Sequence, residues 1–162
     1  MSNEIFIDSI SFAKKSESLQ GKIAVARLER AMESLASAAG ELNFRLIGGL
    51  DSRRRPNLVL SISGPVALTC QRCLVEFQHH LDLESRLILV ENEAQLPDLE
   101  DEDPDVDVVV ASRKTNVLEM IEDEIILGLP LAPRHDVECV AVRVVDDAEE
   151  LGQPFSRLGK PP

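Results

Sequence analysis

Apolar residues recur at intervals of three and four positions between residues 24 and 39. The residues at this spacing are Val25, Leu28, Met32, Leu35 and Ala39. Positions three or four apart lie on one side of an α-helix, so the charged residues between them lie on the other side. Gly40 follows directly and is a typical residue for a helix end. We therefore predict an amphipathic helix at residues 24–39.

A second helical pattern lies at residues 116–129. Asn116 is a favourable N-cap residue, and Glu119 three positions later completes a capping-box pattern. The residues along one side are Val117, Met120, Ile121, Glu124, Ile125 and Gly128. Pro130 follows, and the residue before a proline disfavours the helical conformation. We predict a second helix that ends at this proline.

Between these two segments, apolar and polar residues alternate. The apolar members are Leu42, Phe44 and Leu46, then Leu58, Leu60 and Ile62, and then Val75, Phe77, Leu81, Leu83, Leu87 and Leu89. Alternation places successive side chains on opposite faces, as in a strand with one buried face. No stretch between these strands has the pattern of a crossover helix, so short turns and antiparallel pairing are favoured. We predict an antiparallel sheet over about residues 42–90.

Glycine and proline mark the connections of this sheet. The Gly-Gly pair at 48–49 and the stretch 51–56 predict a loop, and the Ser-Gly-Pro at 63–65 predicts a turn or bulge. Isoleucines and a phenylalanine in residues 5–12 indicate an opening strand or extended arm. Four valines in residues 106–110 indicate a further short strand.

The chain of 162 residues is long enough for one domain and short for two. We predict a single α+β domain at residues 1–145, in which the antiparallel sheet packs with the two helices. Residues 91–107 are predicted to form a mobile acidic loop, because seven acids and no base lie between 98 and 107. Residues 146–162 lose periodicity and are predicted to form a flexible C-terminal tail.

The net charge of -12 narrows the range of functions that fit this fold. An acidic surface repels phosphate at long range, which argues against a protein that coats RNA or an anionic membrane. The N-terminus has no secretory signal pattern and no segment is long and apolar enough to span a membrane, so we expect a cytoplasmic protein without a membrane partner. No nucleophile, phosphate-loop or metalloprotease motif is present, which argues against an enzyme and a small-molecule substrate.

The three cysteines give the strongest local signal. Cys70 and Cys73 are two residues apart, a spacing that lets a tight turn direct both sulfurs to one point, as in zinc-binding turns. With His135 and Cys139 they form a Cys3His ligand set for zinc, the one cofactor that the sequence indicates. In the alternative, Cys70 and Cys73 are strand-end thiols and Cys139 is a small buried residue. Elemental analysis distinguishes the two interpretations.

Two further groups of residues are candidates for binding a partner. Arg53, Arg54 and Arg55 lie in a predicted loop and are candidates for phosphate contact in RNA, or else a solvated turn. Phe155 and Leu158 are one helical turn apart in the predicted tail and are candidates for docking in a groove of a partner protein.

Two blocks and a short C-terminal motif resemble a known family. The first block runs from Leu68 to Phe77 and contains the Cys-Gln-Arg-Cys turn. The second runs from Ile121 to Pro133 and is followed by His135 and Cys139, and a Pro-Phe-x-x-Leu motif comes later. Together they resemble the YceD family, the large ribosomal RNA subunit accumulation proteins. The resemblance implies a role in processing or stability of precursor 23S ribosomal RNA, with no catalytic residue.

Three functions agree with these features. In the first, the protein is an adaptor whose acidic residues 98–107 attract a basic ribosomal or processing protein. In the second, the arginines at 53–55 and the cysteine turn contact ribosomal RNA precursor directly. In the third, the chain is a small zinc-binding or thiol-sensing module unrelated to ribosomes. We favour the adaptor to large-subunit assembly proteins, because the net charge opposes contact with phosphate.

Overall fold

The computed structural model describes residues 4–97, 106–137 and 139. Five strands form one sheet in the order β2-β3-β4-β5-β6, and β1 pairs with β7 in a separate two-stranded ribbon. The elements are β1 Phe6–Ile7, α1 Ser9–Lys14, β2 Ser18–Ala24, the 3-10 turns η1 Val25–Arg27 and η2 Ala31–Ser34, β3 Glu41–Leu50, β4 Pro56–Thr69, β5 Glu76–Val90, the 3-10 turn η3 Glu93–Gln95, β6 Asp107–Val110, β7 Thr115–Asn116 and α2 Val117–Gly128. This is the single α+β domain that the sequence predicted.

The sheet is antiparallel from β2 to β5, as predicted. The register places Leu46 opposite Leu60, and Leu58 opposite Leu87, so apolar positions of neighbouring strands share a face. The predicted strand of valines is β6, but it pairs parallel to β5, with Asp107 opposite Leu87. A parallel pair needs a connection that returns to the same end of the sheet. The long segment between β5 and β6 provides this connection.

The predicted loop is confirmed at residues 51–55, between β3 and β4, but both strands are longer than their glycines suggest. The Gly-Gly pair at 48–49 lies within β3, and the Ser-Gly-Pro at 63–65 lies within β4. Gly64 has a φ of +144°, and a side chain there would meet the Leu42 side chain at 2.9 Å. Ser63 is the last residue of β4 that pairs with β3, so Pro65 interrupts no ladder on that side.

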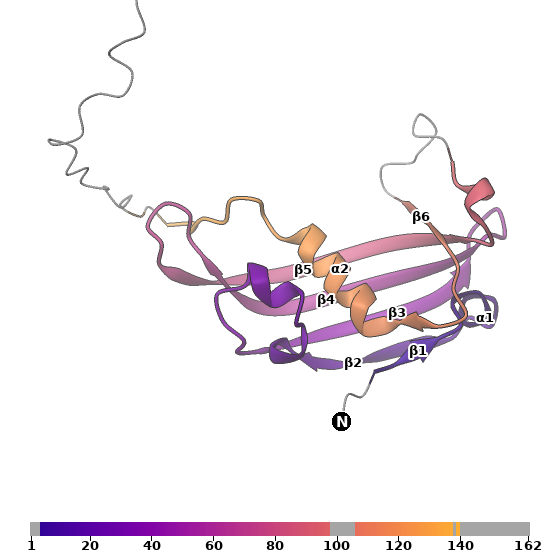
Figure 1. Cartoon of the computed structure of the whole chain (residues 1–162), viewed down its shortest axis with the longest axis horizontal. Helices are drawn as coiled ribbons and strands as arrows, with labels where there is room; N and C mark the ends of the chain where they lie inside the picture. The colour runs from indigo at the N-terminus through magenta and orange to yellow at the C-terminus, as the bar shows by residue number, and fades with distance from the viewer. Residues whose placement is uncertain (1–3, 98–105, 138, 140–162) are drawn as a thin grey trace, which may run out of the picture.

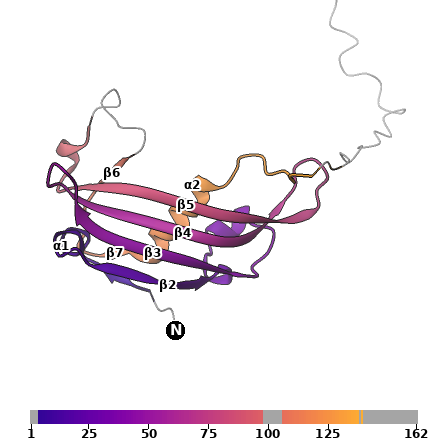
Figure 2. The same cartoon turned by 180° about the vertical axis from the view of Figure 1, so that it is seen from behind.

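The helices cover one face of the sheet only. Buried residues alternate with exposed ones along β3, and the buried positions face α2 and the 3-10 turns. Figure 1 shows α2 in front of the sheet, and Figure 2 shows the opposite face with no described helix over it. The hydrophobic core therefore lies between one face of the sheet and the segments α1, η1, η2 and α2.

The predicted helix at residues 24–39 is wrong. Ala24 still belongs to β2, and the chain continues as the turns η1 and η2. Val25, Leu28 and Ala31 are fully buried at intervals of three, which is the period of a 3-10 helix. The apolar residues at intervals of three and four therefore belong to short turns that pack on the sheet. These turns bury the side chains without a continuous helix.

The second predicted helix is confirmed as α2. The Asn116 side chain accepts a hydrogen bond from the Leu118 amide at 3.0 Å and donates one to Glu119 at 3.2 Å. Glu122, on the inner side, is buried and accepts a hydrogen bond from the Arg30 amide at 2.8 Å, while Asp123 pairs with the Arg30 side chain. These carboxylates fasten the turn η2 to α2.

Helix α1 was not predicted. Residues 5–12 indicated a strand or extended arm, but only Phe6–Ile7 is a strand and Ser9–Lys14 is helical. The Asp8 side chain caps the helix by accepting a hydrogen bond from the Ser11 amide at 3.0 Å. A helix of six residues is too short to show a repeating apolar pattern.

One predicted segment falls partly outside the described residues, and another falls wholly outside them. The acidic loop predicted at 91–107 includes residues 98–105, and the tail predicted at 146–162 lies wholly beyond residue 139. No helix in the part of the chain that the structure describes is long and apolar enough to cross a membrane.

Candidate metal centre

The four candidate zinc ligands lie together at one end of the sheet. Cys70 and Cys73 lie in the turn between β4 and β5, while His135 and Cys139 lie in the segment that follows α2. Cys73 and His135 are 62 positions apart in the sequence. The ligand atoms of all four residues nevertheless lie within 4.8 Å of one another. The sequence predicted these residues correctly as one cluster in space.

The turn that carries Cys70 and Cys73 is held by its own backbone. The Cys70 amide donates to the Val75 carbonyl at 3.0 Å, and the Leu74 amide donates to the Cys70 carbonyl at 2.8 Å. Leu74 adopts a φ of +60°, which reverses the chain. The Arg72 amide points at the Cys70 sulfur, with 3.4 Å from N to Sγ. This is the arrangement in which a CxxC turn presents its thiolates to a metal.

Contacts with the first turn hold the second half of the centre. The Gln71 amide donates to the Pro133 carbonyl at 2.9 Å. The His135 ring stacks on Phe77, the second residue of β5, with 4.9 Å between ring centroids and 24° between planes. Phe77 therefore fixes the orientation of the imidazole. The sequence pattern indicates Phe77 only as an apolar strand position, and the structure adds its contact with His135.

The distances within the cluster fit a tetrahedral metal ion. The Cys70 and Cys139 sulfurs are 3.6 Å apart, and the Cys73 sulfur is 3.2 Å from His135 Nε2. Two thiolates bound to one zinc ion are about 3.8 Å apart, given Zn–S bonds of about 2.3 Å and tetrahedral angles. A disulfide requires about 2.05 Å between sulfurs, and all three cysteines are free. The donor set and its spacing therefore suit zinc.

The electrostatics of the thiols also suit a cation. Burial opposes ionisation of Cys70, but hydrogen bonds from the amides of Cys73, Arg72 and His135 outweigh it and lower its pKa to about 6. Burial, together with the neighbouring Cys70 and Cys73, raises the pKa of Cys139 to about 11. Ionisation of Cys70 therefore opposes ionisation of Cys139, and a divalent ion between these sulfurs would supply the missing positive charge.

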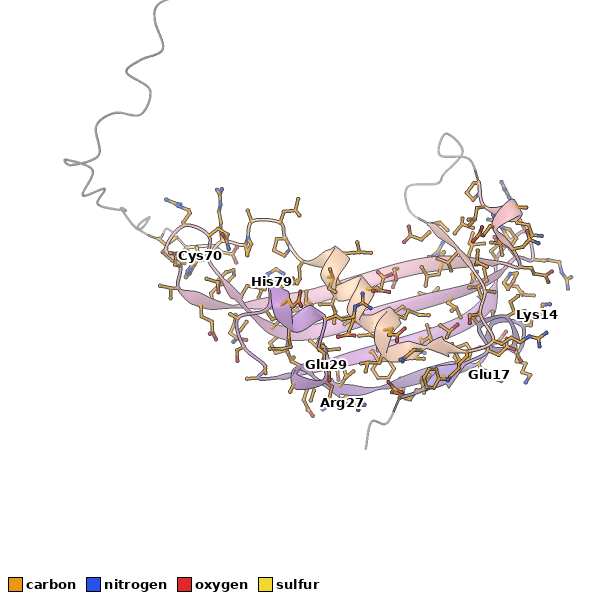
Figure 3. All side chains as sticks on the ribbon, in the orientation of Figure 1. Lys14, Glu17, Arg27, Glu29, Cys70 and His79 are labelled. Carbon is orange, nitrogen blue, oxygen red and sulfur yellow. The ribbon has the colours of Figure 1, made fainter. Side chains whose placement is uncertain are left out.

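The arginine loop lies at the other end of the sheet. Arg53, Arg54 and Arg55 occupy the connection between β3 and β4, and β4 then runs 14 residues to the cysteine turn. At about 3.3 Å per residue, the strand separates the two by about 46 Å. In Figure 3, Cys70 is labelled near one end of the molecule and Lys14, which borders the same hollow as the arginine loop, near the other. The arginines and the cysteine turn therefore do not form one compact surface.

Asp51 organises the arginine loop. Its Oδ1 accepts hydrogen bonds from the Arg53 amide at 2.9 Å and the Arg55 amide at 2.7 Å, and its Oδ2 accepts from Arg55 Nε at 2.7 Å. One of the three arginines is thus paired within the loop itself. Arg53 and Arg54 are exposed and form no ion pair with any other residue in the described ranges. The candidate docking residues Phe155 and Leu158 lie outside the described residues.

Comparison with known proteins links this chain to one family. The family model for the large ribosomal RNA subunit accumulation protein YceD matches residues 58–155, a span that contains all four candidate ligands. The chain is also similar to a protein of Haemophilus influenzae named large ribosomal RNA subunit accumulation protein YceD. The two are 28% identical over 163 residues, which cover 94% of this chain and 91% of the relative. No solved structure matches the chain.

Proposed function

The chain belongs to the YceD family, and on this premise we propose that it supports accumulation of the large-subunit ribosomal RNA as a non-enzymatic factor. The observation that carries the proposal is the match over residues 58–155. This span begins in β4 and includes both halves of the metal centre, so it covers the part of the fold that is built around the cluster.

The metal centre has a structural role in this proposal. Cys70, Cys73, His135 and Cys139 would hold one zinc ion and so cross-link the β4–β5 turn to the segment after α2. Four protein ligands complete a tetrahedral shell and leave no position for water or substrate. Catalytic zinc sites keep such a position open, so this donor set supports a role in folding rather than in a reaction.

The partner in this proposal is a basic protein of large-subunit assembly or ribosomal RNA processing. The net charge of -12 and the seven acids between 98 and 107 favour cationic protein over nucleic acid. Phe155 and Leu158 would add an apolar contact in a groove of the partner. We assign this activity to the cytoplasm, where precursor ribosomal RNA and ribosomal proteins assemble.

A second candidate is direct contact with ribosomal RNA through the arginine loop. Arg53, Arg54 and Arg55 border a surface hollow together with Lys14, so basic side chains from two separate segments gather there. Replacing Arg53 and Arg54 with serine would lower the slope of log affinity against log salt by about 1.4, if each contacts one phosphate of single-stranded RNA. An unchanged slope would reject this contact.

Cells that lack the gene test the main proposal. We expect reduced 23S ribosomal RNA and fewer mature large subunits on a sucrose gradient, with both restored by the wild-type chain. We also expect the tagged chain to co-sediment with large-subunit precursors and to capture basic proteins after nuclease treatment. Two results together would contradict the proposal: normal 23S levels in the deletion strain, and a tagged chain that stays at the top of the gradient away from large-subunit precursors. They would favour a zinc or thiol sensor unrelated to ribosomes.

A further inference from the structure

A large groove lies between α2 and the β5–β6 edge of the sheet. Its volume is about 1010 Å³. Small-molecule sites enclose roughly 300–1,000 Å³, so this groove is at the upper limit for such a ligand and suits a polypeptide segment. Strand β6 and the connection to β7 form one side, and α2 forms the other. Figure 1 shows α2 in front of the sheet and the connection from β6 to β7 beside it.

The floor of the groove is apolar. Leu87 and Leu89 of β5 form it together with Leu58 of β4, and Met120 of α2 lines the wall. At the outer edge, Leu127 also lines the groove and is 78% exposed. Exposed apolar side chains that adjoin a groove usually mark a surface for another protein. The groove can therefore bury apolar side chains of a bound segment.

The walls of the groove are acidic. Asp107 of β6 and Glu124 of α2 both line it. Burial raises the pKa of Glu124, the Ser85 hydroxyl partly offsets this, and the carboxylates of Asp107 and Asp123 raise it further. Asp123 pairs with Arg30. Asp107 and Glu124 form no ion pair with any residue that the structure describes.

The basic residues that line the groove, Arg30 and Lys114, form no ion pair with these two acids. Lys114 places its ammonium 4.5 Å from the centre of the Phe6 ring, and the Arg30 side chain is engaged with Asp123. An apolar floor beneath two uncompensated carboxylates complements a segment that carries apolar and cationic side chains together.

We propose that this groove binds a lysine- or arginine-rich segment of a partner protein, whose apolar side chains rest on Leu87 and Leu89 and whose cations meet Asp107 and Glu124. The inference rests on the proposed function, since this segment would belong to the basic protein that the adaptor holds. It adds to that function a further place of contact on the described fold, besides the acidic residues 98–107 and the C-terminal tail.

Fluorescence anisotropy with a labelled peptide tests the site. The probe has two central leucines flanked by lysines, and its counterpart has glutamates in place of the lysines. The groove variant is Asp107→Asn with Glu124→Gln. The control is Asp82→Asn with Glu84→Gln, which also removes two negative charges but on exposed positions of β5 that face away from α2.

We expect the wild-type chain to bind the lysine peptide and not the glutamate peptide. The groove variant should bind the lysine peptide about tenfold more weakly, and the control should stay within about twofold of wild type. Equal weakening in both variants would show that only net charge attracts the peptide and would overturn the inference. Failure of the wild-type chain to bind the lysine peptide would also overturn it.

Rescue of the deletion strain separates this inference from the proposed function. If the groove variant, folded and zinc-loaded, fails to restore 23S ribosomal RNA while the control restores it, the groove is the contact site. If both restore it fully, the groove inference is wrong and the proposed function stands. If even the wild-type chain restores nothing and the deletion has no defect, the proposed function itself fails.

Discussion

Different kinds of interaction stabilise the two ends of the sheet. At one end, Cys70 and Cys73 meet His135 and Cys139, which are distant in the sequence. At the other end, Asp51 bonds to residues two and four positions away, and α1 packs on β3. The first end depends on long-range contact between polar ligands, and the second depends on local hydrogen bonds and close packing.

This difference predicts which end of the sheet a bound metal would stabilise. Around the metal centre, apolar side chains are exposed: Leu74 is 63% exposed, and Val75 and Leu131 are also exposed. Little hydrophobic packing is therefore available to hold the segment after α2 against the cysteine turn. At the arginine-loop end, Phe12 and Ala13 of α1 are buried against the sheet. We expect zinc removal to release the first end and to leave the second unchanged.

The largest effect should follow from removal of a ligand with Cys70→Ser. Zinc that binds the folded chain alone stabilises it by about 4 kcal/mol when free zinc exceeds the Kd 1,000-fold. For a chain of this size, that corresponds to a fall in Tm of about 8–16 °C. Calorimetry in zinc-containing buffer measures it. Wild-type protein in chelator should show the same fall, and a variant that melts within about 2 °C of zinc-loaded wild type would contradict a stabilising metal.

The substitution Gly48→Ala should destabilise the arginine-loop end of the sheet through a steric clash alone. A Cβ at this position would lie 2.5 Å from the Phe12 carbonyl oxygen and 2.8 Å from the Ala13 Cα, so α1 would have to shift. Such overpacking costs about 1–3 kcal/mol. Denaturant unfolding measures this cost, and zinc content should not change. Gly49→Ala is the control, because its Cβ would meet only the Asn57 side chain at 3.5 Å. Equal destabilisation by both variants would contradict the role of α1 packing.

A smaller effect is expected from Phe77→Leu, which removes the ring that stacks on His135. Groups that orient a metal ligand typically contribute 10–100-fold to metal affinity, and we expect about tenfold weaker zinc binding here. Competition with a coloured chelator measures the affinity. Gln78→Ala is the matched control, since Gln78 lies next in β5 and is exposed. If the two variants bind zinc equally well, Phe77 does not position the imidazole.

The smallest effect is expected from Asp51→Ala in the arginine loop. Burial opposes ionisation of Asp51, but hydrogen bonds from the Arg55 amide and side chain and from the Arg53 amide outweigh it and lower its pKa. A lowered pKa in the folded state stabilises the fold above the ordinary pKa of about 3.9, and this stabilisation is lost as pH falls through the lowered value. At pH 7 the variant should melt no more than a few degrees below wild type.

The pH dependence separates this local role from the metal centre. The difference in Tm between wild type and Asp51→Ala should shrink as pH falls below the ordinary pKa of about 3.9, and it should be lost once pH has fallen through the lowered folded-state pKa. Zinc content at pH 7 should be the same in both proteins. Loss of zinc from the variant would contradict the independence of the two ends.

Much of the sheet and of α2 could be predicted because their signals are local. Alternation along β3 and β4 follows directly from one buried face, and Asn116 with Glu119 marks the start of α2 by hydrogen bonds within one turn. The segment 24–39 misled because intervals of three and four also occur when 3-10 turns pack on a sheet. The parallel pairing of β6 depends on the path of a long connection, which has no local pattern.

The metal ligands were predicted from residue type, and the structure adds how they are positioned. The CxxC spacing of Cys70 and Cys73 requires a tight turn, which the backbone bonds confirm. The partnership with His135 and Cys139 could not follow from spacing alone, since it depends on where α2 ends relative to the sheet. The stacking of Phe77 on His135 likewise could not be predicted from the sequence. Alternation along a strand predicts the sheet face on which a side chain lies, but it does not predict which residue contacts that side chain.

X-ray absorption at the zinc edge tests most directly whether the Cys3His cluster is a zinc centre. The experiment uses full-length protein purified without added metal. We predict about one zinc per chain, bound by three sulfurs at about 2.3 Å and one nitrogen at about 2.0–2.1 Å. A shell of oxygen and nitrogen alone, or protein that folds and contains essentially no zinc, would contradict this assignment.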